Sequence, residues 1–402
     1  MFTRQPEYPS LAMDEVAAVL RGTDHRHLEP IDFGKGVSSF NPFDHVQVDL
    51  SRAHLQAHVG YGDINGLNSL RRAIARYYQE TLDYDLSPER VCITDGASGA
   101  LTIAMAMLLE AGDELVLPES CYPAYRVLAR IFNARVRLAP VTEAGRIDVE
   151  RLPARLSRHS RALLINSPGN PHGTYSDADA LDALAGLGVP AVFDEVYQPL
   201  PLGKEIIPSA IHHTDRHMIV GSLSKSLSIP GFRIGYLIVP KERTQLMTNV
   251  KAVLNMCTSL PSQILAEKLL RHWDELVGRH QQMLQGNWIT FEQTAAHFGL
   301  RLRSHPQAGF FALVDVSEAN LNGMQVSHEL ARFHALGSTP GVDFQNHDNS
   351  FLRLNFACHP HQIKLGLARL ANYLQCDERL PLLRGIPPAE KQVEQKRKFY
   401  LS

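Results

Sequence analysis

The sequence predicts an α/β protein, with a large domain built on a mainly parallel sheet and a smaller α+β domain after it. Three observations point to this fold. The chain has 402 residues, enough for two or three domains of ordinary size. Short apolar runs alternate with longer helical patterns from about residue 90 to residue 240. Beyond about residue 279 the pattern changes to one long helix followed by strands and shorter helices. We therefore place an N-terminal arm at residues 1–45, the large domain at 46–280 and the small domain at 281–402.

The large domain contains six short, nearly continuous apolar runs, and two long helical patterns separate the first three of them. Strands buried on both faces have this composition, and strands that alternate with helices form parallel sheets covered on both sides. The predicted strands are residues 90–94, 114–117, 162–165, 191–193, 218–220 and 236–239, and the predicted helices are residues 98–110 and 123–133.

The small domain begins with a helical pattern over residues 281–298. Three strands and two further helices follow it, at residues 300–302, 310–314, 351–356, 326–336 and 362–374. The first 45 residues carry prolines at positions 6, 9, 30 and 42, which favour an arm and linker over a packed element.

Charge and cysteine content exclude several classes of protein. Lys and Arg number 40 against 42 Asp and Glu, a net charge of −2 that argues against nucleic-acid binding. Five cysteines, with no C-x-x-C pair, are typical of a reducing compartment. The N-terminus lacks the apolar run of a signal peptide, and no apolar stretch approaches the ~20 residues that span a bilayer. We expect a soluble, cytoplasmic protein. The histidines at 212–217 and 359–361 form no closed ligand set, so we expect no metal site.

Four polar or Gly-rich segments follow predicted strands. Ligands of open α/β sheets bind beyond the carboxyl ends of the strands, so these segments should converge. Residues 94–100 combine small residues with a helix start that suits an anion. Residues 166–173, Asn-Ser-Pro-Gly-Asn-Pro-His-Gly, hold two Asn side chains in a rigid turn. Each of these two, taken alone, is equally typical of a plain turn.

The other two segments carry charged side chains. Asp194 ends a buried strand, which costs several kcal/mol unless a cation or hydrogen-bond donors face it; a structural salt bridge would satisfy it equally. Lys225 follows the next strand, in Ser-Leu-Ser-Lys, where desolvation lowers the pKa of an amine and makes it nucleophilic. Arg233, eight residues later in Pro-Gly-Phe-Arg-Ile-Gly, suits bidentate phosphate binding.

Together these segments resemble the class I/II aminotransferases, enzymes of fold type I in the aspartate aminotransferase superfamily that depend on pyridoxal 5′-phosphate (PLP). The motifs Asn-x-Pro-x-Asn-Pro-x-Gly, Asp-Glu-Val-Tyr and Ser-x-Ser-Lys with Pro-Gly-x-Arg-x-Gly occur in the family's order, and the resemblance extends from about Gly36 to Arg353. It implies a seven-stranded type of sheet in a PLP-binding large domain. It also implies a homodimer with shared active sites.

The resemblance implies a role for each matching residue. Lys225 matches the lysine that forms the Schiff base and moves the proton, and Asp194 matches the carboxylate beside the pyridine nitrogen. Asn170 and Tyr197 match the pair that hydrogen-bonds the ring's 3-hydroxyl. Tyr122 matches the aromatic residue that stacks on the ring, although a core tyrosine would look the same. The residues that match the phosphate site are Ala97, Ser98, Ser222 and Arg233.

Three further residues match positions at the substrate side or the subunit interface. Tyr61 matches a tyrosine that reaches the phosphate of the neighbouring subunit. Arg353, in Phe-Leu-Arg-Leu-Asn-Phe, matches the arginine that binds the substrate α-carboxylate, beside Asn170. Gly36 lies in the stretch that lines the substrate side.

The chain departs from the family pattern at two places. His172 replaces the usual Thr of Asn-Pro-Thr-Gly, and we expect a solvent-facing position for it rather than a substrate contact. Residues 255–261 contain no Arg, which argues against a dicarboxylate as the main amino donor.

The resemblance implies a transaminase that moves the amino group of an L-amino acid to a 2-oxo acid through a Lys225 Schiff base and a quinonoid intermediate. A PLP-dependent lyase, or an amino-acid cyclase or oxidase, remains the alternative on the same fold. A β-lactamase-like acyl transferase would need Lys-Thr-Gly and Ser-Asp-Asn, which are absent from the sequence. A DNA-binding regulator fused to this fold would need more than the 60 residues that precede Tyr61.

Overall fold

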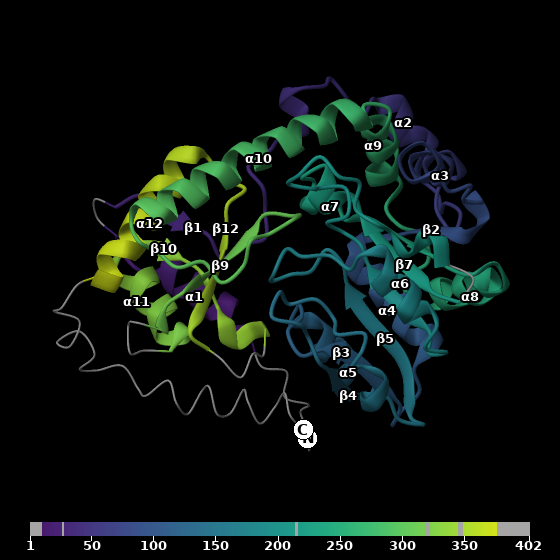
Figure 1. Cartoon of the computed structure of the whole chain (residues 1–402). Coiled ribbons are helices and arrows are strands. Elements are labelled where there is room, and N and C mark those ends of the chain that lie inside the picture. Colours follow the sequence, from purple (N-terminus) through teal and green to yellow (C-terminus); the bar gives the residue numbers. More distant parts are fainter. Residues whose placement is uncertain (1–9, 26–27, 214–215, 318–321, 345–348, 376–402) are drawn as a thin grey trace, which may run out of the picture.

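The computed structural model describes residues 10–25, 28–213, 216–317, 322–344 and 349–375. Two lobes are visible, a larger one that contains a seven-stranded sheet and a smaller one around a three-stranded sheet (Figure 1). The long helix α10 (Trp273–His297) runs from one lobe to the other. The α/β fold with a second, smaller domain is therefore confirmed.

The large sheet has the strand order β2-β8-β7-β6-β5-β3-β4. All its neighbouring strands pair in parallel except β8, which is antiparallel to both β2 and β7. The strands are β2 (Val91–Asp95), β3 (Glu114–Pro118), β4 (Arg135–Ala139), β5 (Ser160–Asn166), β6 (Ala191–Asp194), β7 (Met218–Ser222) and β8 (Ile234–Ile238). The mainly parallel, seven-stranded sheet is confirmed.

Helices cover both faces of this sheet, which explains the nearly continuous apolar strands. Along β5, Leu163 and Ile165 join one hydrophobic cluster, while Ala162 and Leu164 join the cluster on the other face. Helices α3 (Asn68–Leu82), α6 (Ala178–Ala185) and α9 (Leu260–Leu270) contribute to the first cluster. Helices α4 (Gly96–Leu108), α5 (Ala124–Ile131) and α8 (Thr244–Leu254) contribute to the second.

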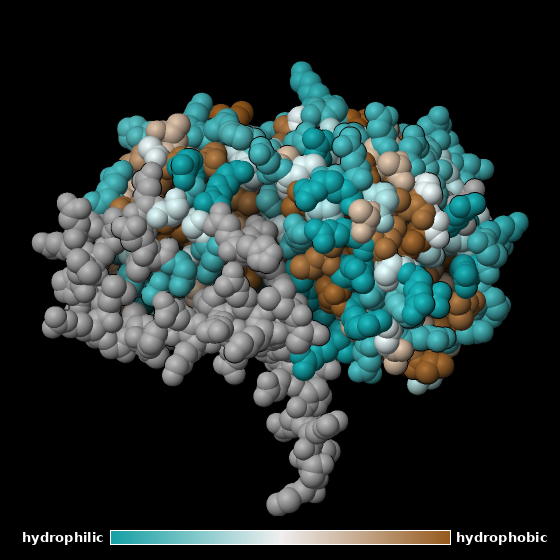
Figure 2. Space-filling model, turned by 60° about the horizontal axis from the view of Figure 1, so that its bottom comes forward, coloured by the Kyte–Doolittle hydropathy of each residue, from teal (hydrophilic) through white to brown (hydrophobic). Residues whose placement is uncertain are grey.

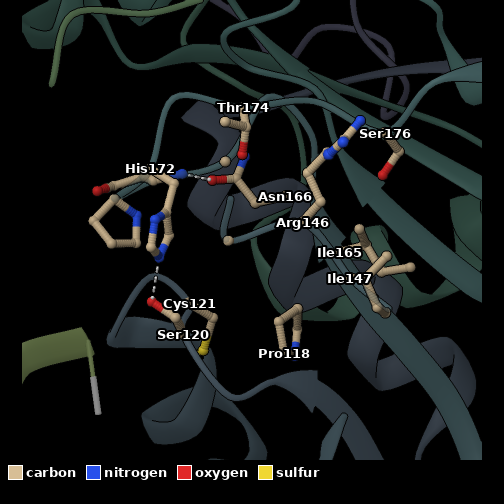
Figure 3. Close-up of a pocket in the computed structure, with 14 residues that line it drawn as sticks. Pro118, Ser120, Cys121, Arg146, Ile147, Ile165, Asn166, His172, Thr174 and Ser176 are labelled. Atoms are coloured by element: carbon tan, nitrogen blue, oxygen red, sulfur yellow. Dashed lines mark hydrogen bonds between the residues drawn. The ribbon is translucent and has the colours of Figure 1, made fainter. Parts of the chain in front are cut away.

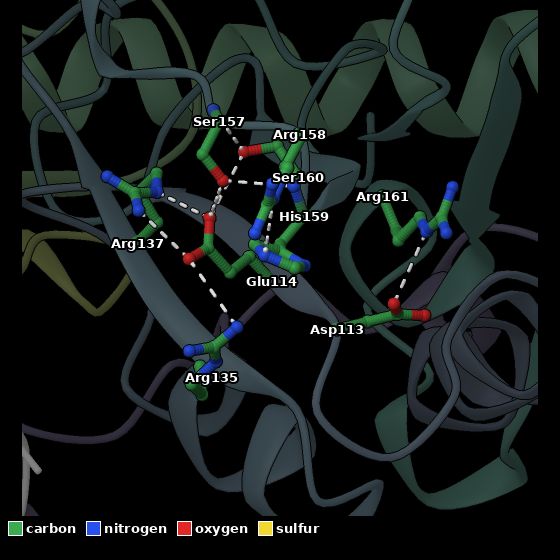
Figure 4. A network of polar contacts seen from close by, with 9 residues as sticks. All are labelled: Asp113, Glu114, Arg135, Arg137, Ser157, Arg158, His159, Ser160 and Arg161. Carbon is green, nitrogen blue, oxygen red and sulfur yellow. Dashed lines mark hydrogen bonds and ion pairs between the residues drawn. The ribbon is translucent and has the colours of Figure 1, made fainter.

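Strand β4 was not expected from the sequence. Its residues Arg-Val-Arg-Leu-Ala alternate in polarity because β4 is an edge strand that is only partly buried. Its Arg137 donates to Glu114 at the start of β3, and Ser157 donates to the same carboxylate at 2.6 Å (Figure 4). Arg137 holds the pKa of Glu114 at about 2. Ser160 also donates to Glu114, and both residues are the first of their strands. This polar cluster therefore lies at the amino end of the sheet, opposite the carboxyl ends where ligands bind.

The small domain contains β9 (Phe311–Asp315), β12 (Phe351–Asn355) and β11 (Thr339–Pro340), in the antiparallel order β11-β12-β9. Helices α11 (Gly323–Phe333) and α12 (Pro360–Gln375) pack on it. The strand expected at residues 300–302 is reduced to a single bridge between Leu302 and Val314.

Part of the N-terminal stretch folds against the small domain. Helix α1 (Ala12–Gly22) lies beside α11, where Val16 and Leu20 pack on Ala331 (Figure 1). Strand β1 (Ile31–Asp32) pairs in parallel with β10 (Leu336–Gly337). An arm and linker were expected here, but the described residues of this stretch make specific contacts with the domain at the other end of the chain.

In the described part of the chain, no helix is long and apolar enough to cross a membrane. On the face seen in Figure 2, hydrophobic residues lie in separate small groups on a mostly hydrophilic surface. The described cysteines, Cys92, Cys121, Cys257 and Cys358, are all free thiols.

Candidate active site

A cleft of about 330 Å³ lies at the carboxyl ends of β5, β6 and β7, with walls from both domains. The end residues Asn166, Asp194 and Ser222 of these strands line it. Every site residue predicted from the sequence lines this cleft except Tyr61. The four segments that were expected to converge do so.

Lys225 follows β7 in the short helix α7 (Leu223–Ser226). Its Nζ donates a 2.6 Å hydrogen bond to the carbonyl of Gly36. That carbonyl is held in place because the Asn355 side chain donates to the flanking carbonyls of Lys35 and Val37, at 2.7 Å each. Burial lowers the pKa of Lys225 to about 8. About a tenth of the amine is therefore neutral and nucleophilic at pH 7, far more than for an ordinary lysine.

Asp194 lies at the end of β6 and is buried. The Tyr125 hydroxyl donates to Oδ2 at 2.6 Å, and the backbone N–H of Val196 donates to Oδ1 at 3.3 Å. Burial raises the pKa of Asp194 to about 6, against the opposing effect of these two donors. Tyr125 was not assigned to the site from the sequence, because its position there is that of an ordinary residue on the apolar face of a helix.

The start of α4 and Arg233 form an anion site at the other end of the cleft. Helix α4 begins at Gly96 directly after β2, with no side-chain cap, so the N–H groups of its first turn, including Ala97 and Ser98, have no helical partner. Gly96 has φ +71°, and a Cβ there would come within 2.5 Å of the Arg233 guanidinium. Arg233 donates to the carbonyl of Asp95, which fixes its guanidinium beside the helix start.

Two serines border this anion site. The Ser222 hydroxyl accepts from the N–H of Ser224 and donates to the carbonyl of Ile234 at 3.1 Å. The hydroxyl of Ser224 is buried and has no partner among the described residues. Ser224 was not assigned from the sequence, yet its hydroxyl is the one left available to a ligand.

Arg353 lies on β12 and is fully buried. Its guanidinium donates to Asn170 Oδ1 at 3.0 Å, to the carbonyl of Gly34 at 2.6 Å and to Thr339 Oγ1 at 2.9 Å. The Phe311 ring centroid is 4.1 Å from the guanidinium carbon. Burial lowers the pKa of Arg353 to about 10, but the group stays cationic at neutral pH. Its Nε is buried without a partner in the described part of the chain, so a donor remains for an anion.

Two tyrosines complete the walls. The Tyr122 ring lies edge-on to Tyr125, with 5.5 Å between the ring centroids. The Tyr197 ring makes edge contacts with Phe310 and Phe311, at 5.6 and 5.8 Å. Burial raises the pKa of both Tyr122 and Tyr197, so both hydroxyls keep their protons at neutral pH.

Tyr61 does not reach the cleft of its own chain. Its side chain is 84% exposed, in the stretch that follows α2 (Arg52–Ala57). The exposed ring is consistent with a role toward another subunit.

His172 lies in a small pocket that adjoins the cleft (Figure 3). Its Nε2 is 3.0 Å from the Ser120 hydroxyl, its Nδ1 is buried without a described partner, and its ring packs against Gly145. Burial lowers the pKa of His172 to about 4, so the ring is neutral. The solvent-facing position expected for His172 is therefore wrong: the imidazole faces inward, because the Gly145 turn leaves room for it.

The groups in the cleft fit PLP. The α4 N-terminus with Arg233 suits its phosphate, the Asp194 carboxylate suits a protonated pyridine nitrogen, and the Lys225 amine suits its aldehyde. When bound, PLP supplies an electron-withdrawing ring that stabilises negative charge at the α-carbon of an amino acid. The unpaired Nε of Arg353 then remains for a carboxylate.

Comparison with curated proteins finds relatives across most of the chain. The putative aminotransferase YugH of Bacillus subtilis (strain 168) is 25% identical over 328 residues, which cover 79% of this chain and 85% of that protein. The valine–pyruvate aminotransferase of Mycobacterium tuberculosis is 26% identical over 381 residues, 91% of this chain and 96% of that protein. A probable aspartate aminotransferase of Methanocaldococcus jannaschii is 25% identical over 84% of this chain and 91% of that protein.

Solved structures share the fold. An aminotransferase from Mycobacterium tuberculosis superimposes with a TM-score of 0.83 at 24% identity, over 92% of this chain and 99% of that one. The aspartate aminotransferase of Thermotoga maritima gives 0.82 at 23% identity, over 92% and 98%. The sequence profile of the aminotransferases of class I and II matches residues 29–370. The chain therefore belongs to the class I and II aminotransferase family, whose enzymes depend on PLP.

Proposed function

We propose that this enzyme transfers the amino group of an L-amino acid to a 2-oxo acid. The observation that carries the proposal is the presence, in one cleft, of a partly neutral amine, a buried carboxylate and a buried guanidinium with an unused donor. An amino acid offers an amine and a carboxylate at fixed spacing, and the cleft has a partner for each.

Lys225 and Asp194 are the central residues of the proposal. The Lys225 amine carries the cofactor and then moves the proton at the α-carbon of the substrate. Its hydrogen bond to the carbonyl of Gly36 supports this role, because we place the substrate beside Gly36. Asp194 keeps the pyridine nitrogen protonated, since an ionised carboxylate stabilises the adjacent positive charge.

The remaining residues position the cofactor. Tyr122 would lie against the ring, and Asn170 and Tyr197 would hydrogen-bond its 3-hydroxyl. The anion site would hold the phosphate; it consists of Ala97, Ser98, Ser222 and Arg233, together with the free hydroxyl of Ser224.

Arg353 binds the substrate α-carboxylate. Its planar guanidinium is fixed by three acceptors and lies against the face of Phe311, so its orientation is set before substrate arrives. Because the Oδ1 of Asn170 accepts a hydrogen bond from Arg353, the side chain assigned to the cofactor ring also orients the arginine assigned to the substrate carboxylate.

The enzyme acts as a homodimer in which Tyr61 serves the phosphate of the partner subunit. Large hydrophobic side chains are exposed around α2 and the end of α8, namely Leu55, Val59, Tyr61, Val253, Leu254 and Met256. Gly62 lies against Leu260 at the start of α9, so the Tyr61 segment and the start of α9 adjoin each other. A second subunit would cover this apolar surface. The cysteine content, which is typical of proteins in a reducing compartment, supports a place in cytoplasmic amino-acid metabolism.

The purified protein should be incubated with a panel of amino acids and 2-oxo acids, and the products identified by mass spectrometry. Exchange of the amino group, with formation of a new amino acid and a new 2-oxo acid, is the expected result. Ammonia, peroxide or a cyclised product as the main outcome would contradict transamination and support the lyase, oxidase or cyclase alternative.

A further inference from the structure

Met13 brings helix α1 into the active-site cleft. It lies in the first turn of α1 and is among the residues that line the cleft. The backbone N–H groups of Ala12 and Met13 donate to the two carboxylate oxygens of Asp343, at 2.7 Å each. Asp343 is 1% exposed. A carboxylate at a helix N-terminus is electrostatically favourable, so this pair of bonds fixes the start of α1 and with it the position of Met13.

The same contacts place Met13 at the Arg353 end of the cleft. Asp343 is followed by Phe344, whose ring centroid is 5.2 Å from the Arg353 guanidinium carbon. Thr339, four residues before Asp343, accepts a hydrogen bond from the same guanidinium. The anion site around Arg233, in contrast, is built on the start of α4 in the other domain. Met13 therefore lies near the substrate carboxylate and away from the phosphate.

The cleft has no further cationic side chain among its described residues that could pair with a second carboxylate on the substrate. Among the described residues that line it, the cationic side chains are Lys225, Arg233 and Arg353, and each has a role in the proposed reaction. Asp14 follows Met13 and is exposed. Its carboxylate adds to the effect of burial in raising the pKa of Tyr122, so its negative charge acts on a residue that lines the cleft. A substrate with an anionic side chain would be unpaired and repelled there.

We propose that Met13 and Phe311, which both line the cleft, form the surface that contacts the substrate side chain, and that the amino donor has an uncharged, apolar side chain. Phe311 suits this surface because its ring covers Arg353 and comes within 3.3 Å of the place where a Cβ on Gly36 would lie. The inference rests on the proposed aminotransferase function and names its substrate class. Burial of an apolar side chain against Met13 and Phe311 supplies the selectivity.

The first experiment measures binding without reaction. The purified holoenzyme is titrated calorimetrically with 4-methylpentanoate and with succinate, two carboxylates that lack an amino group. 4-Methylpentanoate should bind more tightly than succinate, and Met13→Ala should weaken its binding roughly tenfold, the usual effect of lost apolar contact. Met13→Leu should restore it. Tighter binding of succinate, or equal binding by the parent and Met13→Ala, would overturn the inference.

The second experiment reverses the preference. Met13→Arg places a cation in this surface and should raise the ratio of kcat/KM for glutamate over leucine roughly tenfold or more. Ala18→Arg adds the same charge at an exposed position of the same helix and should leave the ratio unchanged. An unchanged ratio in Met13→Arg, or a parent enzyme that prefers glutamate or lysine to leucine, would overturn the inference. Absence of amino transfer with every amino acid would refute the proposed function instead, while the carboxylate titration would still decide the role of Met13.

Discussion

The hydroxyl of Tyr125 and the carboxylate of Asp194 form a 2.6 Å hydrogen bond across the wall of the cleft. Tyr125 belongs to α5, and Asp194 ends β6, so the bond joins a helix on one face of the sheet to the strand end that carries the acid. Burial raises the pKa of Asp194 to about 6, and the Tyr125 bond opposes that rise. Tyr125 therefore widens the pH range in which Asp194 is ionised.

Replacing Tyr125 with Phe should shift the acid limb of the pH profile. Without the donor, the pKa of Asp194 rises further, so the carboxylate is neutralised at a higher pH and activity falls earlier as the pH is lowered. In plots of kcat/KM against pH, this limb should lie at higher pH than in the parent, while activity near pH 8.5 stays close to that of the parent. Asp194→Asn, which has no charge at any pH, should lose about 10²- to 10³-fold in kcat throughout. An unshifted limb in Tyr125→Phe would contradict the role of the bond.

Lys225 should carry the cofactor covalently. Borohydride reduction of the yellow holoenzyme should fix the pyridoxyl group to Lys225, and peptide mapping identifies the labelled residue. Because burial lowers the pKa of Lys225 to about 8, the amine is protonated below that pH and neutral above it. The rate of PLP uptake by the apoprotein should therefore rise with pH and level off above about 8. Label on another lysine, or covalent uptake by Lys225→Arg, would refute the assignment.

Arg353→Lys should weaken substrate binding although it keeps the charge. Lysine lacks the planar fork, in which one terminal nitrogen of Arg353 donates to Asn170 and the other to Gly34 and Thr339. The KM for amino acids should rise by about one to two orders of magnitude, in line with the loss of one or two charge-assisted hydrogen bonds of about 1.5–3 kcal/mol. Steady-state kinetics with amino acids and with the corresponding amines provides the check. Amines that react as fast as amino acids with the parent enzyme would show that Arg353 has another role.

Gly235→Ala should lower the affinity for PLP through the anion site. A Cβ at Gly235 would come within 2.7 Å of the backbone nitrogen of Ala97 and would push the start of α4 away from Arg233. Overpacking of this kind costs about 1–3 kcal/mol, so the Kd for PLP should rise roughly tenfold. Gly231→Ala is the matched control, since nothing lies within 4 Å of a Cβ there. Titration of both variants by fluorescence should separate them; equal affinities would argue against a phosphate at the α4 start.

Tyr61 should complement a defect in the other subunit. When Tyr61→Ala and Lys225→Ala chains are unfolded and refolded together, half of the dimers are mixed. One site of each mixed dimer has both defects and the other has neither. Roughly a quarter of the parental activity should then return, although each variant alone is poorly active or inactive. If no activity returns, Tyr61 acts in the site of its own chain. A monomeric enzyme, measured by light scattering, would refute the shared site.

The sequence predicted the catalytic side of the cleft because its residues lie in short motifs after strands. Asp194 and Lys225 are local to their strand ends, so order along the chain was enough to place them together. Tyr125 could not be found in this way, since its contact with Asp194 depends on how α5 packs on the sheet. Met13 was missed for the same reason: its place in the cleft is set by Asp343, far away in the sequence.

The errors in the fold have similar physical causes. Strand β4 alternates charged and apolar residues because it lies at the edge of the sheet, and its pattern lacks the buried run used to find the others. Residues 300–302 have the apolar alternation of a strand, but their pairing is limited to one β-bridge, between Leu302 and Val314. The inward position of His172 depends on Gly145, which has φ +77° and leaves space for the ring.

The anchoring of α1 has a consequence for the growing chain on the ribosome. Ala12 and Asp343 are 331 positions apart, so at about 5–20 residues per second α1 waits for roughly 15–65 s before its anchor is made. During that time Val16 and Leu20 have no partner on α11, and the strand that pairs with Ile31 is not yet synthesised either. Helix α1 is thus synthesised long before the residues on which it docks. A chain that ends before residue 343 would contain every strand of the seven-stranded sheet, yet it would leave Met13 without its anchor.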